Sequence, residues 1–123
     1  MAADVDRVAL LAALVRYELP IEPVLRKLAA VPWDSTKEVA HVGVPDIVAI
    51  LDRFLRRELS VEQVTQWADL LEVRDDVGLE PRHANALREI LFRLANPTLC
   101  DAITPALVES IRIELLGLGE AAG

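Results

Sequence analysis

Proline residues divide this chain into segments whose apolar side chains recur every three or four positions, the spacing of an α-helix. Proline ends a helix that precedes it and fits the first turn of a helix that follows it. Pro20 and Pro97 fall where a helix should end, and Pro45 and Pro105 where one should begin. The predicted helices span residues 4–19, 22–31, 45–57, 61–74, 82–95 and a sixth that begins at Pro105 after a Thr104 cap.

The composition favours the same architecture. The 123 residues are 53% hydrophobic but only 4% aromatic, so aliphatic side chains must build the core. Helices with aliphatic seams do this readily, whereas strand-rich domains use more threonine, tyrosine and phenylalanine. We therefore expect residues 1–123 to form a single all-α domain, a compact bundle of about five to six helices. One short extended segment is expected near residues 38–43, with no evident hairpin partner.

Two local signals stand out inside these predicted elements. Ser60 and Gln63 form a capping box, because the Ser60 hydroxyl can accept from the Gln63 amide while the Gln63 side chain reaches back. Trp67 falls on the apolar face of the helix that follows, so we expect it in the core rather than on a base-stacking surface. Trp33 follows Pro32 outside regular structure and is expected to fill the loop after the second helix.

Negative charge is concentrated in one segment of the chain. The formal net charge is −7, from 13 basic and 20 acidic residues. Residues 58–80 hold seven acidic side chains and one basic one, net −6, so they carry nearly the whole imbalance. Such a field repels polyanions and steers cations towards it. Nucleic acid and anionic membranes are therefore excluded as expected partners, and a cationic protein is favoured.

The cysteine count and the N-terminal residues favour a cytoplasmic protein. Cys100 is the only cysteine, so no disulfide can form within the chain, which suits a reducing compartment. The run "VALLAALV" looks like the apolar region of a signal peptide, but Asp4 and Asp6 precede it where a signal would be basic. It is also too short to span a bilayer. We expect it to be a core helix.

Known kinds of catalytic and metal site find no support in the sequence. Asp75 and Asp76 are adjacent, but in a polar turn water should keep both ionised, which does not suit acid–base catalysis. The stretch "DDVGLE" lacks the alternating ligands of an EF-hand loop. His41, His83 and Cys100 have no metal-ligand spacing; His83 is expected at the surface and Cys100 as a small buried group. We therefore predict a protein that is not an enzyme and uses no metal or cofactor.

Helical geometry predicts which side chains of the acidic segment lie on the same face. At about 100° per residue, Glu62, Asp69, Glu72 and Asp76 share one stripe, with Leu70 and Val73 along its edge. Like charges at this spacing cost an isolated helix a few tenths of a kcal/mol per pair. Two interpretations remain open, a solvated face with no partner and a surface that binds one.

The segments "FLRRELS", "VTQWADLLEVRDDVG" and "LREILFRLANP" closed by "ITP" resemble a group of small helical bacterial proteins. These are the colicin-type immunity proteins and the immunity proteins of contact-dependent growth inhibition systems. The likeness covers roughly residues 47–108, with a weaker one at "LAAVPWD".

The resemblance implies an antitoxin that binds one cognate toxin domain, commonly a basic nuclease, and blocks it without catalysis. Carried over by position, the partner-binding acids are Glu62, Asp69, Glu72, Asp75, Asp76 and Glu80. Leu70 and Val73 are expected at the centre of that interface. The alternative is a structural or regulatory helical module that self-associates or docks on a larger assembly through other apolar residues. The oligomeric state and the toxin's identity are not predicted.

Overall fold

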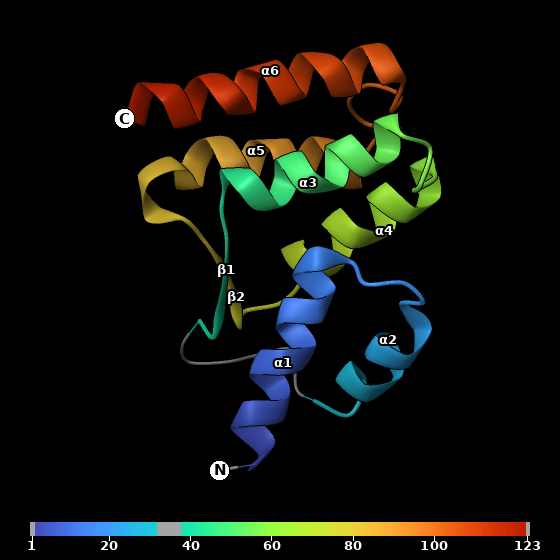
Figure 1. Ribbon diagram of the computed structural model, residues 1–123, viewed down its shortest axis with the longest axis vertical. Coiled ribbons are helices and arrows are strands. Elements are labelled where there is room, and N and C mark those ends of the chain that lie inside the picture. Colours follow the sequence, from blue (N-terminus) through green and yellow to red (C-terminus); the bar gives the residue numbers. More distant parts are fainter. Residues whose placement is uncertain (1, 32–37, 123) are drawn as a thin grey trace.

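The computed structural model describes residues 2–31 and 38–122, with side chains for residues 7–31 and 38–118. The described residues form six α-helices, one 3-10 helix (η1) and two short strands (Figure 1). In chain order these are α1 Ala2–Arg16, α2 Glu22–Leu28, β1 Ala40–Val42, α3 Val44–Leu55, α4 Val61–Glu72, β2 Val77–Leu79, η1 Pro81–His83, α5 Ala84–Ala95 and α6 Pro105–Ala122. The prediction of a compact, essentially all-α fold is confirmed. None of the described helices is both long enough and apolar enough to cross a bilayer.

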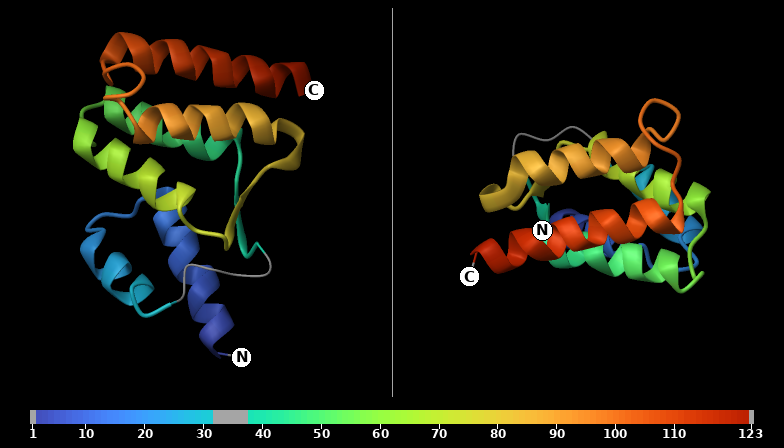
Figure 2. Two further views of the ribbon diagram at one scale, coloured as in Figure 1. Left: turned by 180° about the vertical axis from the view of Figure 1, so that it is seen from behind. Right: turned by 90° about the horizontal axis from the view of Figure 1, so that it is seen from above.

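The helices lie in two groups joined by α4. α6 lies across one end of the molecule over α3 and α5, and α1 and α2 form the other end (Figure 1). Seen from above, α3 and α5 run on either side of α6 (Figure 2). α4 packs along α5 and also contacts α1 and α3. One face of α4 is therefore held by both groups.

The core is aliphatic, as the composition predicts. Leucine, isoleucine and valine from α1, α3, α4, α5 and α6 form one continuous buried cluster. Trp67 is fully buried within it, which confirms its predicted place. Its indole Nε1 donates to the Val15 carbonyl over 3.0 Å, so the one polar atom of this side chain is satisfied.

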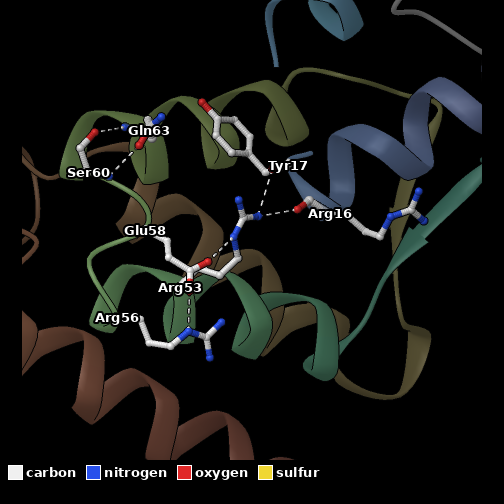
Figure 3. A network of polar contacts seen from close by, with 7 residues as sticks. All are labelled: Arg16, Tyr17, Arg53, Arg56, Glu58, Ser60 and Gln63. Carbon is white, nitrogen blue, oxygen red and sulfur yellow. Dashed lines mark hydrogen bonds and ion pairs between the residues drawn. The ribbon is translucent and has the colours of Figure 1, made fainter. Parts of the chain in front are cut away.

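The C-terminal end of α1 is fixed by side chains from two other helices, of which Figure 3 shows Arg53 of α3. Arg53 of α3 donates from Nη1 to the carbonyls of Arg16 and Tyr17, over 2.8 and 3.0 Å. Tyr17 has a left-handed backbone (φ 49°), and its hydroxyl donates to Gln66 Oε1 of α4 over 2.5 Å. The last carbonyls of a helix have no partner within it, so these donors complete α1 and tie it to α3 and α4.

Both predicted helix caps are present. Ser60 Oγ accepts from the Gln63 amide over 3.1 Å, and the Ser60 amide donates to Gln63 Oε1 over 2.8 Å. Thr104 Oγ1 accepts from the Leu107 amide over 3.2 Å at the start of α6. The predicted starts of α4 and α6 are therefore correct.

Several predicted helix ends extend too far. α1, α2, α3 and α4 end at residues 16, 28, 55 and 72, two to three residues before the predicted ends. Positive φ angles at Tyr17 and Arg57 leave the helical region just after α1 and α3. Apolar spacing continues past these points, so periodicity alone could not locate the change in backbone direction.

The expected extended segment is present, and it has a partner that the sequence did not reveal. β1 pairs in parallel with β2, with Ala40 opposite Val77 and Val42 opposite Leu79. The partner lies inside the acidic segment, where a loop was expected. Trp33 lies outside the described residues.

Candidate partner-binding surface

The exposed side of α4 carries four residues that we call the α4 crest: Glu62, Gln66, Asp69 and Val73. The first three line a shallow hollow with Ala95 and Pro97. Glu62, Gln66, Asp69 and Val73 follow one another at helical spacing, and all four are exposed. Val73, just after the helix, is 54% exposed, a large fraction for an aliphatic side chain. The opposite face carries the buried Val64, Trp67, Ala68 and Leu71.

The predicted acidic stripe and its edge differ from this crest at four positions, Gln66, Glu72, Leu70 and Asp76. Gln66 belongs to the crest but was not predicted; its place at i+4 from Glu62 was the available signal. Glu72 is exposed but turned towards α5, where it lines a hollow of about 220 Å³ with Arg88 and Leu91. Leu70 is half-buried and faces α2.

The acids of this region lack ion-pair partners. Within the described part of the chain, Glu62, Asp69, Glu72 and Asp75 make no salt bridge. Acids elsewhere are often paired: Asp52 lies 2.6 Å from Arg112 Nε, and Glu58 lies 2.7 Å from Arg56 Nε. The negative charges of these acids are therefore exposed to solvent and are not neutralised by a salt bridge.

Glu72 shows the electrostatic cost of this arrangement. Partial burial raises the pKa of Glu72 above its ordinary value, and the neighbouring charge of Asp69 raises it further. Asp69 and Glu72 are three residues apart, close enough on a helix for like charges to repel. A cation bound beside the two carboxylates would reduce the repulsion between them.

The prediction of Asp76 as a partner-binding residue was wrong. It is fully buried, whereas a solvated turn and a place on the acidic stripe were expected. α4 ends at Glu72, so the helical geometry that placed Asp76 on the stripe does not reach it. Its carboxylate lies 2.9 Å from Arg74 Nε and 3.3 Å from Arg7 Nε. Asp76 is thus neutralised internally, and it is not available to a partner in this fold.

The backbone of Asp76 is also occupied. Its carbonyl accepts from the amides of Val39 and Ala40, over 2.7 and 3.1 Å, at the start of the strand pair. The residue therefore joins α1, the turn after α4 and β1. Its role in the structure is to hold these three segments together.

Glu80 also has a structural role and does not belong to the α4 crest. It is half-buried, and its Oε2 accepts from the Val44 amide over 3.4 Å at the N-terminus of α3. A Cβ at Gly43 would lie 2.9 Å from this oxygen, so the glycine leaves room for the carboxylate. Negative charge at a helix N-terminus is favourable. Of the predicted acids, Glu62, Asp69, Glu72 and Asp75 remain exposed, and none of them has a counter-ion among the residues that the structure describes.

No set of three histidine, cysteine, aspartate or glutamate side chains that could hold a metal lies among the described residues. His41 Nε2 lies 3.2 Å from Glu38 Oε1 at the surface. His83 is half-buried in η1, and Cys100 is exposed. The expectation of a buried Cys100 was wrong, because the turn after α5 leaves residues 98–102 at the surface.

Comparisons with protein-family models, with curated proteins and with solved structures found no match to this chain. The residues considered for function are therefore those of the α4 crest and the exposed acids next to it.

Proposed function

We propose that the chain is an immunity protein that binds and neutralises a cationic toxin domain through the exposed side of α4. The observation that carries this proposal is the set of acids without internal counter-ions, Glu62, Asp69, Glu72 and Asp75. Glu62, Asp69 and Glu72 lie on α4, and Asp75 lies just beyond its end. Stability alone favours alternating charges on a helix, so this concentration of acids supports an external partner. The resemblance to immunity proteins supplies the class of that partner, and the cytoplasm is the proposed compartment.

The mechanism is inhibition by binding. Acidic side chains on a rigid helix accelerate the encounter with a basic surface, and the effect weakens as salt screens the charges. The bound chain then blocks the toxin domain sterically and electrostatically. No bond is made or broken by the chain itself.

Growth rescue tests the proposal directly. The product of the adjacent gene, as the candidate toxin, is expressed alone, with the wild-type chain, and with the variant Glu62→Lys/Asp69→Lys/Glu72→Lys. The wild-type chain should restore growth and co-purify with the toxin domain, and the variant should do neither. A neighbouring product that is harmless, or rescue that survives the triple reversal, would contradict the proposal.

A matched control separates local from overall charge. Glu22, Glu89 and Asp101 are also exposed and make no salt bridge within the described residues. Glu22→Lys/Glu89→Lys/Asp101→Lys changes the net charge by the same amount, away from the crest. This control should still rescue growth.

The alternative, a self-associating helical module, has one observation in its favour. Ile113 and Leu116 on α6 are 61% and 39% exposed and, three residues apart, lie on one face of the helix. If that face joins two copies, Ile113→Asp should convert a dimer to a monomer in light scattering. The oligomeric state should then depend little on salt, unlike binding through α4.

A further inference from the structure

A shallow hollow of about 710 Å³ lies between the exposed side of α4 and the C-terminal end of α5. Three half-buried apolar side chains line it: Val61 at the start of α4, Ala95 at the end of α5, and Pro97 just after that end. Glu62 and Asp69 of the α4 crest line the same hollow. Apolar surface and two carboxylates therefore lie together in one place.

The polar groups of the hollow lack partners within the described part of the chain. Glu62 and Asp69 make no salt bridge there. Thr65 also lines the hollow, and its hydroxyl oxygen is buried without a hydrogen-bond partner among the described residues. Buried hydroxyls in native proteins are nearly always hydrogen-bonded, so the missing partner of Thr65 calls for an explanation.

Helical spacing gathers these three groups around one point. Glu62 precedes Thr65 by three residues and Asp69 follows it by four, so both carboxylates are neighbours of Thr65 on the surface of α4. Threonine in a helix takes either of two χ1 rotamers, so its hydroxyl can turn towards a donor placed over the side chain. A cation with several donors, placed over Thr65, would be within reach of both carboxylates and the hydroxyl.

We infer that this hollow binds an arginine side chain of the partner, with the guanidinium between Glu62 and Asp69 and over Thr65. A guanidinium carries five N–H donors and keeps its charge, so it can serve two carboxylates and a hydroxyl together. The methylene groups of arginine pack readily on apolar surface, which Val61, Ala95 and Pro97 provide. This inference rests on the proposed function and names the partner residue that the hollow recognises.

The chemistry of the hollow favours arginine over other occupants. A lysine ammonium has three donors and is strongly hydrated, so it matches an apolar lining with three separate acceptors less well. A divalent metal needs more ligands than two carboxylates, and no set of three metal-ligating side chains occurs among the described residues. A second copy of the chain would bring a formal charge of −7, which like-charge repulsion opposes.

The probe is the capped tripeptide acetyl-Gly-Arg-Gly-amide, followed by NMR of the unmodified chain. A citrulline version keeps the shape of arginine without its charge, and a lysine version keeps the charge without the planar group. The arginine peptide should shift the methyl signals of Val61, Thr65 and Ala95, and the citrulline peptide should not. It should bind roughly fivefold more tightly than the lysine peptide, the effect of about one additional hydrogen bond.

Three results of this titration would overturn the inference. Equal binding of the arginine and lysine peptides would show that charge alone is recognised. Absence of a saturable shift at Val61, Thr65 and Ala95 would show that the hollow does not bind arginine. The same shifts on raising the concentration of the chain alone would place a second copy in the hollow.

Asp69→Asn tests the carboxylate with little change in shape. It should weaken binding of the arginine peptide by roughly tenfold, because a hydrogen bond to a charged group is lost. The matched control is Glu89→Gln on α5, an exposed acid that makes no salt bridge within the described residues. This control changes the net charge equally and should bind the peptide like wild type. Equal weakening by both substitutions would contradict the inference.

Thr65→Val separates recognition from stability. The hydroxyl has no partner within the described fold, so its loss should leave the Tm unchanged or raise it. Binding of the arginine peptide should still weaken by roughly threefold, since one acceptor of the guanidinium is gone. Undiminished binding, or a lower Tm, would show that the hydroxyl serves the fold rather than a ligand and would contradict the inference.

The proposed function and this inference can fail separately. If the triple reversal abolishes growth rescue while the chain does not distinguish arginine from lysine peptides, the acidic surface stands and the arginine site fails. If the arginine peptide binds in the hollow but the product of the adjacent gene is not neutralised, the arginine site stands and the immunity function fails.

Discussion

Asp76 shows how far the role of a residue can differ from that of its neighbour. Asp75 is exposed, and Asp76 is fully buried between Arg74 and Arg7. A buried carboxylate is tolerable only with partners, and here two arginines from distant parts of the sequence provide them. The same carboxylate is shared by both arginines.

Asp76→Ala should therefore be strongly destabilising. It leaves Arg74 and Arg7, which are largely buried, without their shared counter-ion. Breaking a buried ion pair in this way typically costs about 3–5 kcal/mol. Urea unfolding followed by circular dichroism measures the loss, and Asp75→Ala is the control, expected to change stability by less than about 0.5 kcal/mol. Similar effects of both substitutions would argue against the buried network.

Glu72 gives a prediction about pH. The pKa of Glu72 is raised from an ordinary value of 4.5, by partial burial first and by Asp69 second. The folded chain thus binds this proton more tightly than the unfolded chain, and the associated stability is lost as pH rises from 4.5 through the raised pKa. Glu72→Gln cannot ionise and should be more stable than wild type at pH 7 but not at pH 4. Thermal unfolding at the two pH values checks this.

The cause of that effect can be tested separately. In an Asp69→Asn background, one of the two causes of the raised pKa is gone, so Glu72→Gln should stabilise the chain less at pH 7. An identical gain in both backgrounds would mean that Asp69 has no influence and that burial alone acts.

At the scale of the element, α4 is a helix with two separate tasks. Its capping box and its buried face hold it in the fold, and its outer face carries the acids. Because like charges oppose an isolated helix, the cap and the packing of Trp67 must offset them.

Ser60→Ala should weaken α4 in a measurable way. It removes the hydroxyl that accepts from the Gln63 amide, and loss of such a cap costs about 1 kcal/mol. Calorimetry should show a lower Tm for this variant, whereas Ser60→Asp, which can also cap, should stay close to wild type. A Tm unaffected by Ser60→Ala would show that packing alone fixes the start of the helix.

Elements such as α4 were predictable because their signals are local. The Ser60–Gln63 box and the Thr104 cap lie within one turn, so the sequence displays both partners side by side. The burial of Asp76 depends on Arg7, and the pairing of Ala40 with Val77 joins segments far apart in the chain. A helical projection continued past Glu72 therefore assigned Asp76 to the wrong surface, although it placed Glu62 and Asp69 correctly in solvent.

For the whole molecule, the question is whether net charge or its location steers a partner. Both triple reversals change three acids to lysines and take the formal charge from −7 to −1. One is at Glu62, Asp69 and Glu72 on α4, called the crest reversal because two of its sites are on the crest, and the other is at Glu22, Glu89 and Asp101. Steering by location predicts that only the crest reversal slows association.

Stopped-flow association with the toxin domain at several salt concentrations distinguishes these cases. For the wild type and the control variant, the rate constant should fall by about tenfold or more between low salt and roughly 0.5 M. The crest variant should be slow throughout, with little dependence on salt. Equal slowing by both reversals would assign the steering to the net charge of the molecule.

The interleaving of crest and core along α4 has a consequence for the evolution of such a chain. Exposed residues occupy positions 62, 66, 69 and 73, and the buried ones occupy 64, 67, 68 and 71. No position belongs to both sets, but Gln66 accepts from the Tyr17 hydroxyl, so of the outer set only Glu62, Asp69 and Val73 can change without losing a hydrogen bond to the rest of the fold. A chain of this design can exchange one partner for another through a few substitutions on a single helix. Similarity between related chains would then persist mainly among their buried residues.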